Sequence, residues 1–135
     1  MSGPSNGPYT IQNAETKKWV FVDNEKRLAT CEDESRASTF EFSLVQGRGV
    51  YTIRSRHYGE LVNPEEAYES KKLYLKYTTF EWTIQDSGSR TYNIGMALND
   101  LWWDSKFSSH HESEVTLKKS SSDSTAWLLM PPRDD

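Results

Sequence analysis

Hydrophobic and polar residues alternate in short runs along almost the whole of this chain. The runs Phe40-Glu41-Phe42-Ser43-Leu44 and Tyr51-Thr52-Ile53 show the pattern, in which every second residue is apolar. Because successive side chains of a β-strand point to opposite faces, this alternation predicts half-buried strands. Apolar residues at helical spacing extend over no more than one turn, at residues 64–68. The pattern therefore predicts an all-β domain built from many short strands.

The alternating runs recur along the chain with a period of about 42 residues. A Tyr-x-Ile triplet begins at Tyr9, Tyr51 and Tyr92, and these positions are 42 and 41 residues apart. One such unit cannot cover its own apolar face, so three units are expected to pack around a shared axis. We define units one, two and three as residues 9–49, 50–90 and 91–130, each with four predicted strands.

Each unit closes with a strand that carries an aromatic residue at an equivalent place: Phe42, Trp82 and Trp127. Large rings bury more area than aliphatic side chains, so these residues are predicted to be structural core positions. Outside the repeats, residues 1–8 are predicted to be a flexible segment. Residues 131–135 are predicted to be a C-terminal tail, because proline removes a donor from the strand ladder.

The repeat resembles the β-trefoil fold over residues 9 to about 130. Within that fold, the length, the single cysteine and the YTIQN opening are similar to small cytosolic trefoils of mushrooms, a fungal group of lectins and of serine and cysteine protease inhibitors. Ricin-type sugar sites carry a Gln-x-Trp mark in the fourth strand. Here the aromatic residue is kept and the glutamine is replaced by Phe40, Phe80 and Thr125. The resemblance therefore implies the scaffold and leaves lectin and inhibitor as alternatives.

Composition narrows the classes of function. Sixteen Lys and Arg residues against twenty Asp and Glu residues give a net charge of −4, and the basic residues form only scattered pairs. A nucleic-acid-binding domain is expected to carry a basic stripe, so this class is not favoured. The single cysteine, Cys31, lies beside acidic residues that disfavour a thiolate nucleophile. We expect no enzyme activity, no cofactor, no metal and no membrane insertion, and a cytoplasmic location without a signal peptide.

The run Trp102-Trp103-Asp104 is the strongest candidate binding motif. If neighbouring strand residues face opposite ways, one indole is predicted to be exposed beside a carboxylate. An exposed indole can stack on the apolar face of a sugar ring while the carboxylate accepts hydrogen bonds from hydroxyl groups. Asn99 and His110 are predicted polar partners. The first hypothesis is therefore a lectin with one site in unit three, for which glycans or glycoproteins are the partners and agglutination would require a homo-oligomer.

The second hypothesis is a protease inhibitor that presents a rigid loop to an enzyme cleft. Basic residues at two predicted turns are candidates for such a loop: Lys26 and Arg27 in the first turn, and Arg48 in the second. The excess of aromatic residues favours the lectin, and the missing glutamines favour the inhibitor.

Overall fold

The computed structural model describes residues 3–105 and 112–132, which contain twelve strands joined antiparallel throughout. Unit one comprises β1 (Gly7–Asn13), β2 (Trp19–Val22), β3 (Leu28–Cys31) and β4 (Phe40–Val45), and unit two comprises β5 (Val50–Ser55), β6 (Leu61–Pro64), β7 (Leu73–Lys76) and β8 (Trp82–Gly88). Unit three comprises β9 (Thr91–Met96), β10 (Leu101–Ser105), β11 (Ser113–Lys119) and β12 (Trp127–Met130). Three short 3-10 helices join them: η1 (Glu34–Arg36), η2 (Ala97–Asn99) and η3 (Asp123–Thr125).

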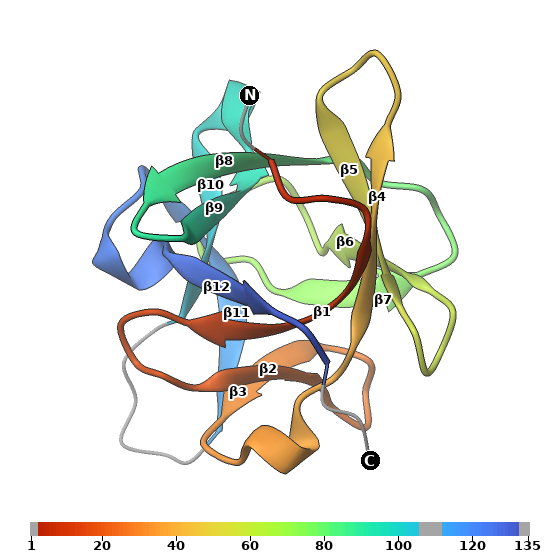
Figure 1. Cartoon of the computed structure of the whole chain (residues 1–135), viewed down its shortest axis with the longest axis vertical. Helices are drawn as coiled ribbons and strands as arrows, with labels where there is room; N and C mark the ends of the chain where they lie inside the picture. The colour runs from red at the N-terminus through yellow and green to blue at the C-terminus, as the bar shows by residue number, and fades with distance from the viewer. Residues whose placement is uncertain (1–2, 106–111, 133–135) are drawn as a thin grey trace.

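The first and fourth strands of the units close into a six-stranded barrel. Its strands pair in the order β1, β4, β5, β8, β9 and β12, and β12 returns to β1 (Figure 1). The second and third strands of each unit form hairpins at one end of the barrel. Pairing of β11 with β3 joins these hairpins to one another, and so do single bridges between Arg27 and Tyr74 and between Lys72 and Thr116. The architecture is a β-trefoil, which confirms the predicted all-β fold and its three units.

The core is built from equivalent positions of the three units. The isoleucines of the three Tyr-x-Ile triplets, Ile11, Ile53 and Ile94, are completely buried, and so are Trp82 and Trp127. Phe42 is buried as well, so the prediction that Phe42, Trp82 and Trp127 are core residues is confirmed. The predicted equivalence is wrong for Phe42, because the residue that pairs with the opening tyrosine in unit one, as Trp82 and Trp127 do in their units, is the buried Phe40. Burial of such rings provides much of the hydrophobic stabilisation, because each removes a large apolar area from water.

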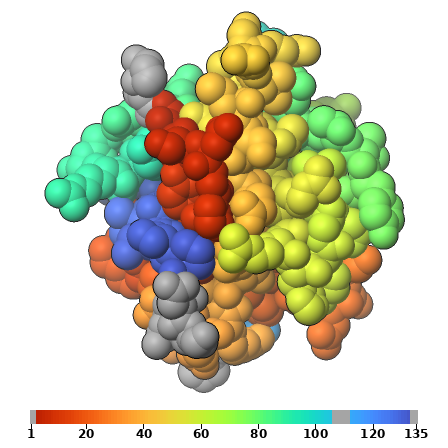
Figure 2. Space-filling view, turned by 45° about the vertical axis from the view of Figure 1, so that its right-hand side comes forward, coloured from red at the N-terminus to blue at the C-terminus, as the bar shows by residue number. Residues whose placement is uncertain are grey.

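The first residues of the chain pack across the barrel. The hydroxyl groups of Tyr9 and Tyr51 donate hydrogen bonds to the carbonyl oxygens of Ser5 and Pro4, each at 2.7 Å. β1 begins at Gly7, two residues before the boundary expected from the sequence, and lies between β4 and β12 (Figure 2). Gly7 and Pro8, which were predicted to belong to the N-terminal segment, are therefore part of β1. Among the described residues, no helix is long and apolar enough to cross a membrane.

Candidate functional site

Both tryptophans of the Trp102-Trp103-Asp104 run are buried. Trp103 is fully enclosed in the core, where its ring meets those of Trp82 and Trp127 edge to face, with centroids 5.4 and 6.5 Å away. Trp102 is only 5% exposed. The prediction that one of the two indoles is exposed is therefore wrong, and neither ring is available to stack on a sugar.

Trp102 is buried because β10 is paired on both sides, with β9 and with β11. On β9 it faces Gly95, whose missing side chain leaves room for the indole. A Cβ atom at Gly95 would lie 2.8 Å from Cε3 of Trp102 and 2.0 Å from the carbonyl oxygen of Leu101. The indole Nε1 donates a hydrogen bond to Oδ1 of Asp100 at 2.8 Å. The alternation of side chains along one strand predicts the face to which each residue points. It does not predict whether a neighbouring strand covers that face.

Asp104 lies at a polar pocket of about 400 Å³ on the outer side of the unit-three hairpin. Its side chain is mostly buried and accepts a hydrogen bond from the hydroxyl of Ser124 in η3. Two further carboxylates, of Glu15 and Glu69, line the pocket with Asp104. Hydroxyl groups and one ammonium group complete the polar lining: Ser70, Ser105, Thr116, Ser124 and Lys118.

All three units contribute to this pocket. Glu15 comes from the β1–β2 loop of unit one, and Glu69 comes from the β6–β7 loop of unit two. A hydrogen bond holds the β6–β7 loop of unit two against β11: the amide of Ser70 donates to the carbonyl oxygen of Leu117 at 2.7 Å. Lys118 donates to Ser122 Oγ, also at 2.7 Å, which holds its ammonium toward η3. The pocket walls are therefore fixed by hydrogen bonds before any ligand arrives.

Equivalent positions in the other units carry different chemistry. The register of the hairpins aligns Trp102-Trp103-Asp104 with Trp19-Val20-Phe21 in unit one and with Leu61-Val62-Asn63 in unit two. Asp104 thus corresponds to Phe21, on which Arg36 stacks at 4.5 Å, and to Asn63, which donates to the carbonyl oxygen of Thr78 at 2.8 Å. At this position only unit three has a carboxylate.

The remaining predicted sugar-site residues are not brought to the pocket. Asn99 is exposed on η2 and is not part of the pocket lining. His110 lies outside the described residues. Glu15 and Glu69 were not predicted from the sequence, where they are 89 and 35 positions from Asp104 and belong to no motif.

The three basic residues of the predicted inhibitory loops differ in their ion pairs and in the exposure of their side chains. Lys26 forms a 2.6 Å ion pair with the buried Glu60, and Arg27 forms ion pairs with Asp23, Glu25 and Glu114. Arg48 lies in the turn of the β4–β5 hairpin, which projects at the top of Figure 1, and its side chain is 65% exposed. Its ion pair with Glu81 has a length of 3.3 Å. Of the three, Arg48 is the most accessible to a partner.

No protein-family model matches this chain, and no curated protein matches it by sequence. Solved structures do match it. The chain is similar to the ricin B-like lectin of Macrolepiota procera in complex with lactose, with a TM-score of 0.77 and 19% identity over 98% of both chains. It is similar to the Rhizoctonia solani agglutinin, with a TM-score of 0.80 and 13% identity over 96% of this chain and 98% of that one.

A proteinase inhibitor from Coprinopsis cinerea is also similar, with a TM-score of 0.73 and 11% identity over 94% of this chain and 98% of that one. At these identities the likeness is one of fold. The chain shares its β-trefoil architecture with lectins and with a proteinase inhibitor, and this architecture is compatible with either function.

Proposed function

We propose that this chain is a carbohydrate-binding protein and that the pocket around Asp104 is its sugar site. The observation that carries the proposal is the composition of the pocket. Carboxylates from three different units converge there with hydroxyl groups and an ammonium group. A sugar offers many hydroxyl groups that both donate and accept hydrogen bonds, so a small polar pocket of mixed donors and acceptors matches it.

The roles of the side chains follow from their chemistry. Asp104, Glu15 and Glu69 would accept hydrogen bonds from sugar hydroxyls, and charge-assisted bonds of this kind are stronger than neutral ones. Lys118 and Thr116 would donate to ring or hydroxyl oxygens. Trp102 and Trp103 are buried, and their packing would hold β10 in place beneath the site. With no exposed indole at the pocket, we expect weak binding of a monosaccharide, with a Kd on the order of 1 mM.

The test is a glycan array followed by calorimetric titration of the best ligand. Asp104→Asn keeps the shape of the side chain and removes its charge, so we expect at least tenfold weaker binding with an unchanged melting temperature. Asp123→Asn is the matched control. Asp123 is exposed on η3, next to the pocket residue Ser124, but does not itself line the pocket. Equal binding by wild type and Asp104→Asn would refute the Asp104 site, and an array without any bound glycan would refute the function.

A protease inhibitor remains the second candidate, and Arg48 is the observation that favours it. Gly47 and Gly49 flank it with φ angles of +78° and +70°, which glycine adopts without strain. Such a tight turn would present the arginine of a projecting hairpin to a trypsin-like cleft. Inhibition of trypsin or papain by the wild-type chain, lost in Arg48→Ala, would support this candidate. Neither function involves catalysis by the chain itself.

A further inference from the structure

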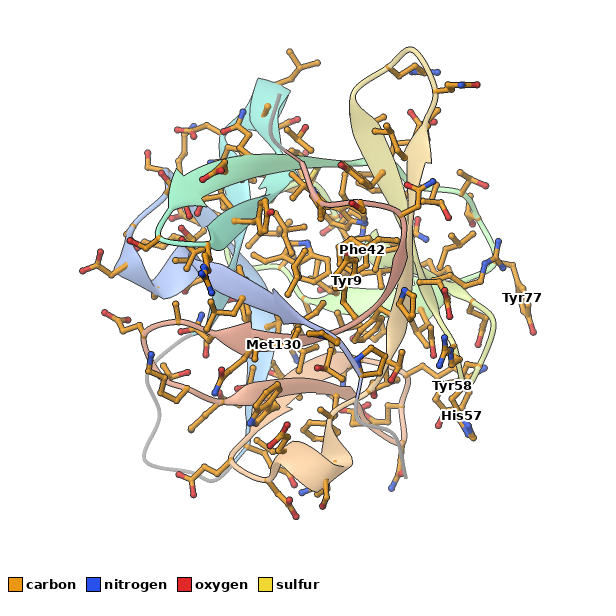
Figure 3. All side chains as sticks on the ribbon, viewed as in Figure 1. Tyr9, Phe42, His57, Tyr58, Tyr77 and Met130 are labelled. Carbon is orange, nitrogen blue, oxygen red and sulfur yellow. The ribbon has the colours of Figure 1, made fainter. Side chains whose placement is uncertain are left out.

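The exposed tyrosines of this chain gather in one unit. Tyr58, Tyr68 and Tyr77 are 40%, 66% and 82% exposed, and all three belong to unit two. Figure 3 shows Tyr58 and Tyr77 on the same side of the molecule. The strands and η3 that carry most of the Asp104 pocket lie on the other side of the same view. Single surface tyrosines are common, so the positions of these tyrosines relative to one another and to charged groups decide whether they form a site.

Three loops bring the cluster together. Tyr58 lies in the β5–β6 loop, Tyr77 follows β7, and Lys26 lies in the β2–β3 turn of unit one. The amide of Leu75 in β7 donates to the carbonyl oxygen of Lys26 at 2.9 Å, which fixes this turn beside the end of β7. The phenols of Tyr77 and Tyr58 both contribute to the raised pKa of Lys26, after the larger effect of its hydrogen bond with Glu60. Tyr77, two residues after Leu75, therefore follows the end of β7 that this turn contacts.

Tyr58 and Lys26 are held in place before any ligand binds. The ring of His57 meets that of Tyr58 edge to face at 4.7 Å, and Nζ of Lys26 lies 5.4 Å from the centre of the Tyr58 ring. Glu60, whose side chain is only 6% exposed, forms an ion pair with that ammonium at 2.6 Å. Little conformational entropy would be lost when a ligand stacks on the Tyr58 ring, which is already positioned.

The chemistry of the cluster fits an uncharged glycan. Two phenol faces can stack on the C–H faces of sugar rings, and the ammonium can donate to a sugar hydroxyl. Because Glu60 already neutralises Lys26, the cluster offers no net charge to an anionic ligand. A stable protein interface uses roughly 20–30 residues a side around an apolar centre, which is much larger than two separate rings and one ion pair.

We propose that Tyr58, Tyr77 and Lys26 form a second glycan site, for neutral sugars, on unit two. This inference rests on the proposed carbohydrate binding and extends it. With sites on two sides of the molecule, a single chain would cross-link glycans without forming an oligomer.

The experiment compares variants on a printed array of neutral oligosaccharides that includes lactose, and then by calorimetric titration of each bound glycan. Tyr58→Ala and Tyr77→Ala each remove one ring. Tyr77→Phe keeps the ring, and Tyr68→Ala is the matched control, because Tyr68 is an exposed tyrosine of the same unit that lies in the β6–β7 loop. Asp104→Asn removes the pocket proposed above. Melting temperatures check that every variant is folded.

We expect the wild type to bind two glycans per chain and to precipitate a multivalent glycoconjugate. Tyr77→Ala and Asp104→Asn should each reduce the stoichiometry to one and abolish precipitation, and their combination should bind none. Tyr77→Phe and Tyr68→Ala should behave as the wild type. Tyr58→Ala should weaken the unit-two site at least tenfold.

Four results would overturn or redirect the proposal. If Tyr58→Ala and Tyr77→Ala match the wild type while Asp104→Asn loses all binding, the second site is wrong and the Asp104 site stands. If Tyr77→Ala loses all binding and Asp104→Asn none, the Asp104 site is wrong and the tyrosine site stands. If Tyr68→Ala loses as much glycan binding as Tyr77→Ala, binding does not depend on a defined cluster of Tyr58, Tyr77 and Lys26, and the second site is wrong. A wild type that binds no glycan would refute both sites.

Discussion

The indole Nε1 of Trp127 donates a hydrogen bond to the backbone carbonyl oxygen of Trp103 at 3.0 Å. Trp82 makes the same bond in unit two, to the carbonyl oxygen of Val62 at 2.9 Å. These two bonds tie the fourth strand of a unit to its second strand in the buried core. Unit one has Phe40 at this place, and there the amide of Ser38 donates to the equivalent carbonyl oxygen, of Val20, at 3.0 Å. The acceptor is satisfied in all three units, by two different donors.

Replacing Trp127 by phenylalanine should destabilise the fold more than the lost ring area alone predicts. A ring remains, but the buried carbonyl oxygen of Trp103 loses its donor, which costs about 1–3 kcal/mol. Trp127→Ala should cost about 3–5 kcal/mol, since it also leaves a cavity. Chemical denaturation measures both values. Unchanged stability in Trp127→Phe would show that the hydrogen bond contributes nothing.

The converse change in unit one, Phe40→Trp, should also destabilise the fold. Here the carbonyl oxygen of Val20 already accepts from Ser38, so the new indole N–H would be buried without that acceptor. The larger ring would also overpack a fully enclosed site, and we expect a loss of about 1–3 kcal/mol. The measurement is the same denaturation experiment. A gain in stability would contradict this prediction, because it would show that the core of unit one has space for the larger ring.

Gly95→Ala should be among the most damaging small substitutions in the chain. The added methyl group would meet the backbone of β10, which cannot move as a flexible side chain can. We expect a loss of about 3 kcal/mol, at the upper end for overpacking, and a changed fluorescence spectrum as Trp102 is displaced. Ser43→Ala, at an exposed position of β4, is the control and should be neutral.

Sialylation of a glycan should weaken its binding to the Asp104 pocket. Three carboxylates against one ammonium give this pocket an acidic character, and the carboxylate of sialic acid would be repelled. In a calorimetric comparison of lactose with 3′-sialyllactose, we expect several-fold weaker binding of the sialylated sugar. Added salt should reduce the difference, because it screens exposed charges. Tighter binding of 3′-sialyllactose would contradict the charge argument.

Acid should remove the contribution of Asp100 to stability. Hydrogen bonds from the indole of Trp102 and from the hydroxyl of Ser120 hold the pKa of Asp100 below its ordinary value. The stabilisation is therefore complete above the unfolded pKa of about 3.9 and is lost as the pH falls through the lower folded pKa. The difference in unfolding free energy between wild type and Asp100→Asn should thus shrink from pH 6 to pH 2.5. A constant difference would contradict this.

The candidate site could be predicted only in part. The sequence predicted a site in unit three with the carboxylate of Asp104, which the proposed pocket also includes, because one short run of residues suggested a strand with a polar face. It could not indicate Glu15 and Glu69, which reach the pocket through loops of the other two units. Nor could it indicate the cluster of Tyr58, Tyr77 and Lys26, because surface tyrosines are common and only the pairing of hairpins brings these loops together.

The architecture itself was determined by the sequence. Alternation of apolar residues specifies strands, and its recurrence from Tyr9 to Tyr51 to Tyr92 specifies three equivalent units, because each unit must bury the same face. The tertiary structure decided whether the face of a strand opposite the core is also covered by other residues. Trp102 alternates with Trp103 and yet is buried with it, because β9 pairs against β10 and Gly95 leaves space for the ring. Local periodicity describes one strand, whereas burial depends on neighbours that are distant in the chain.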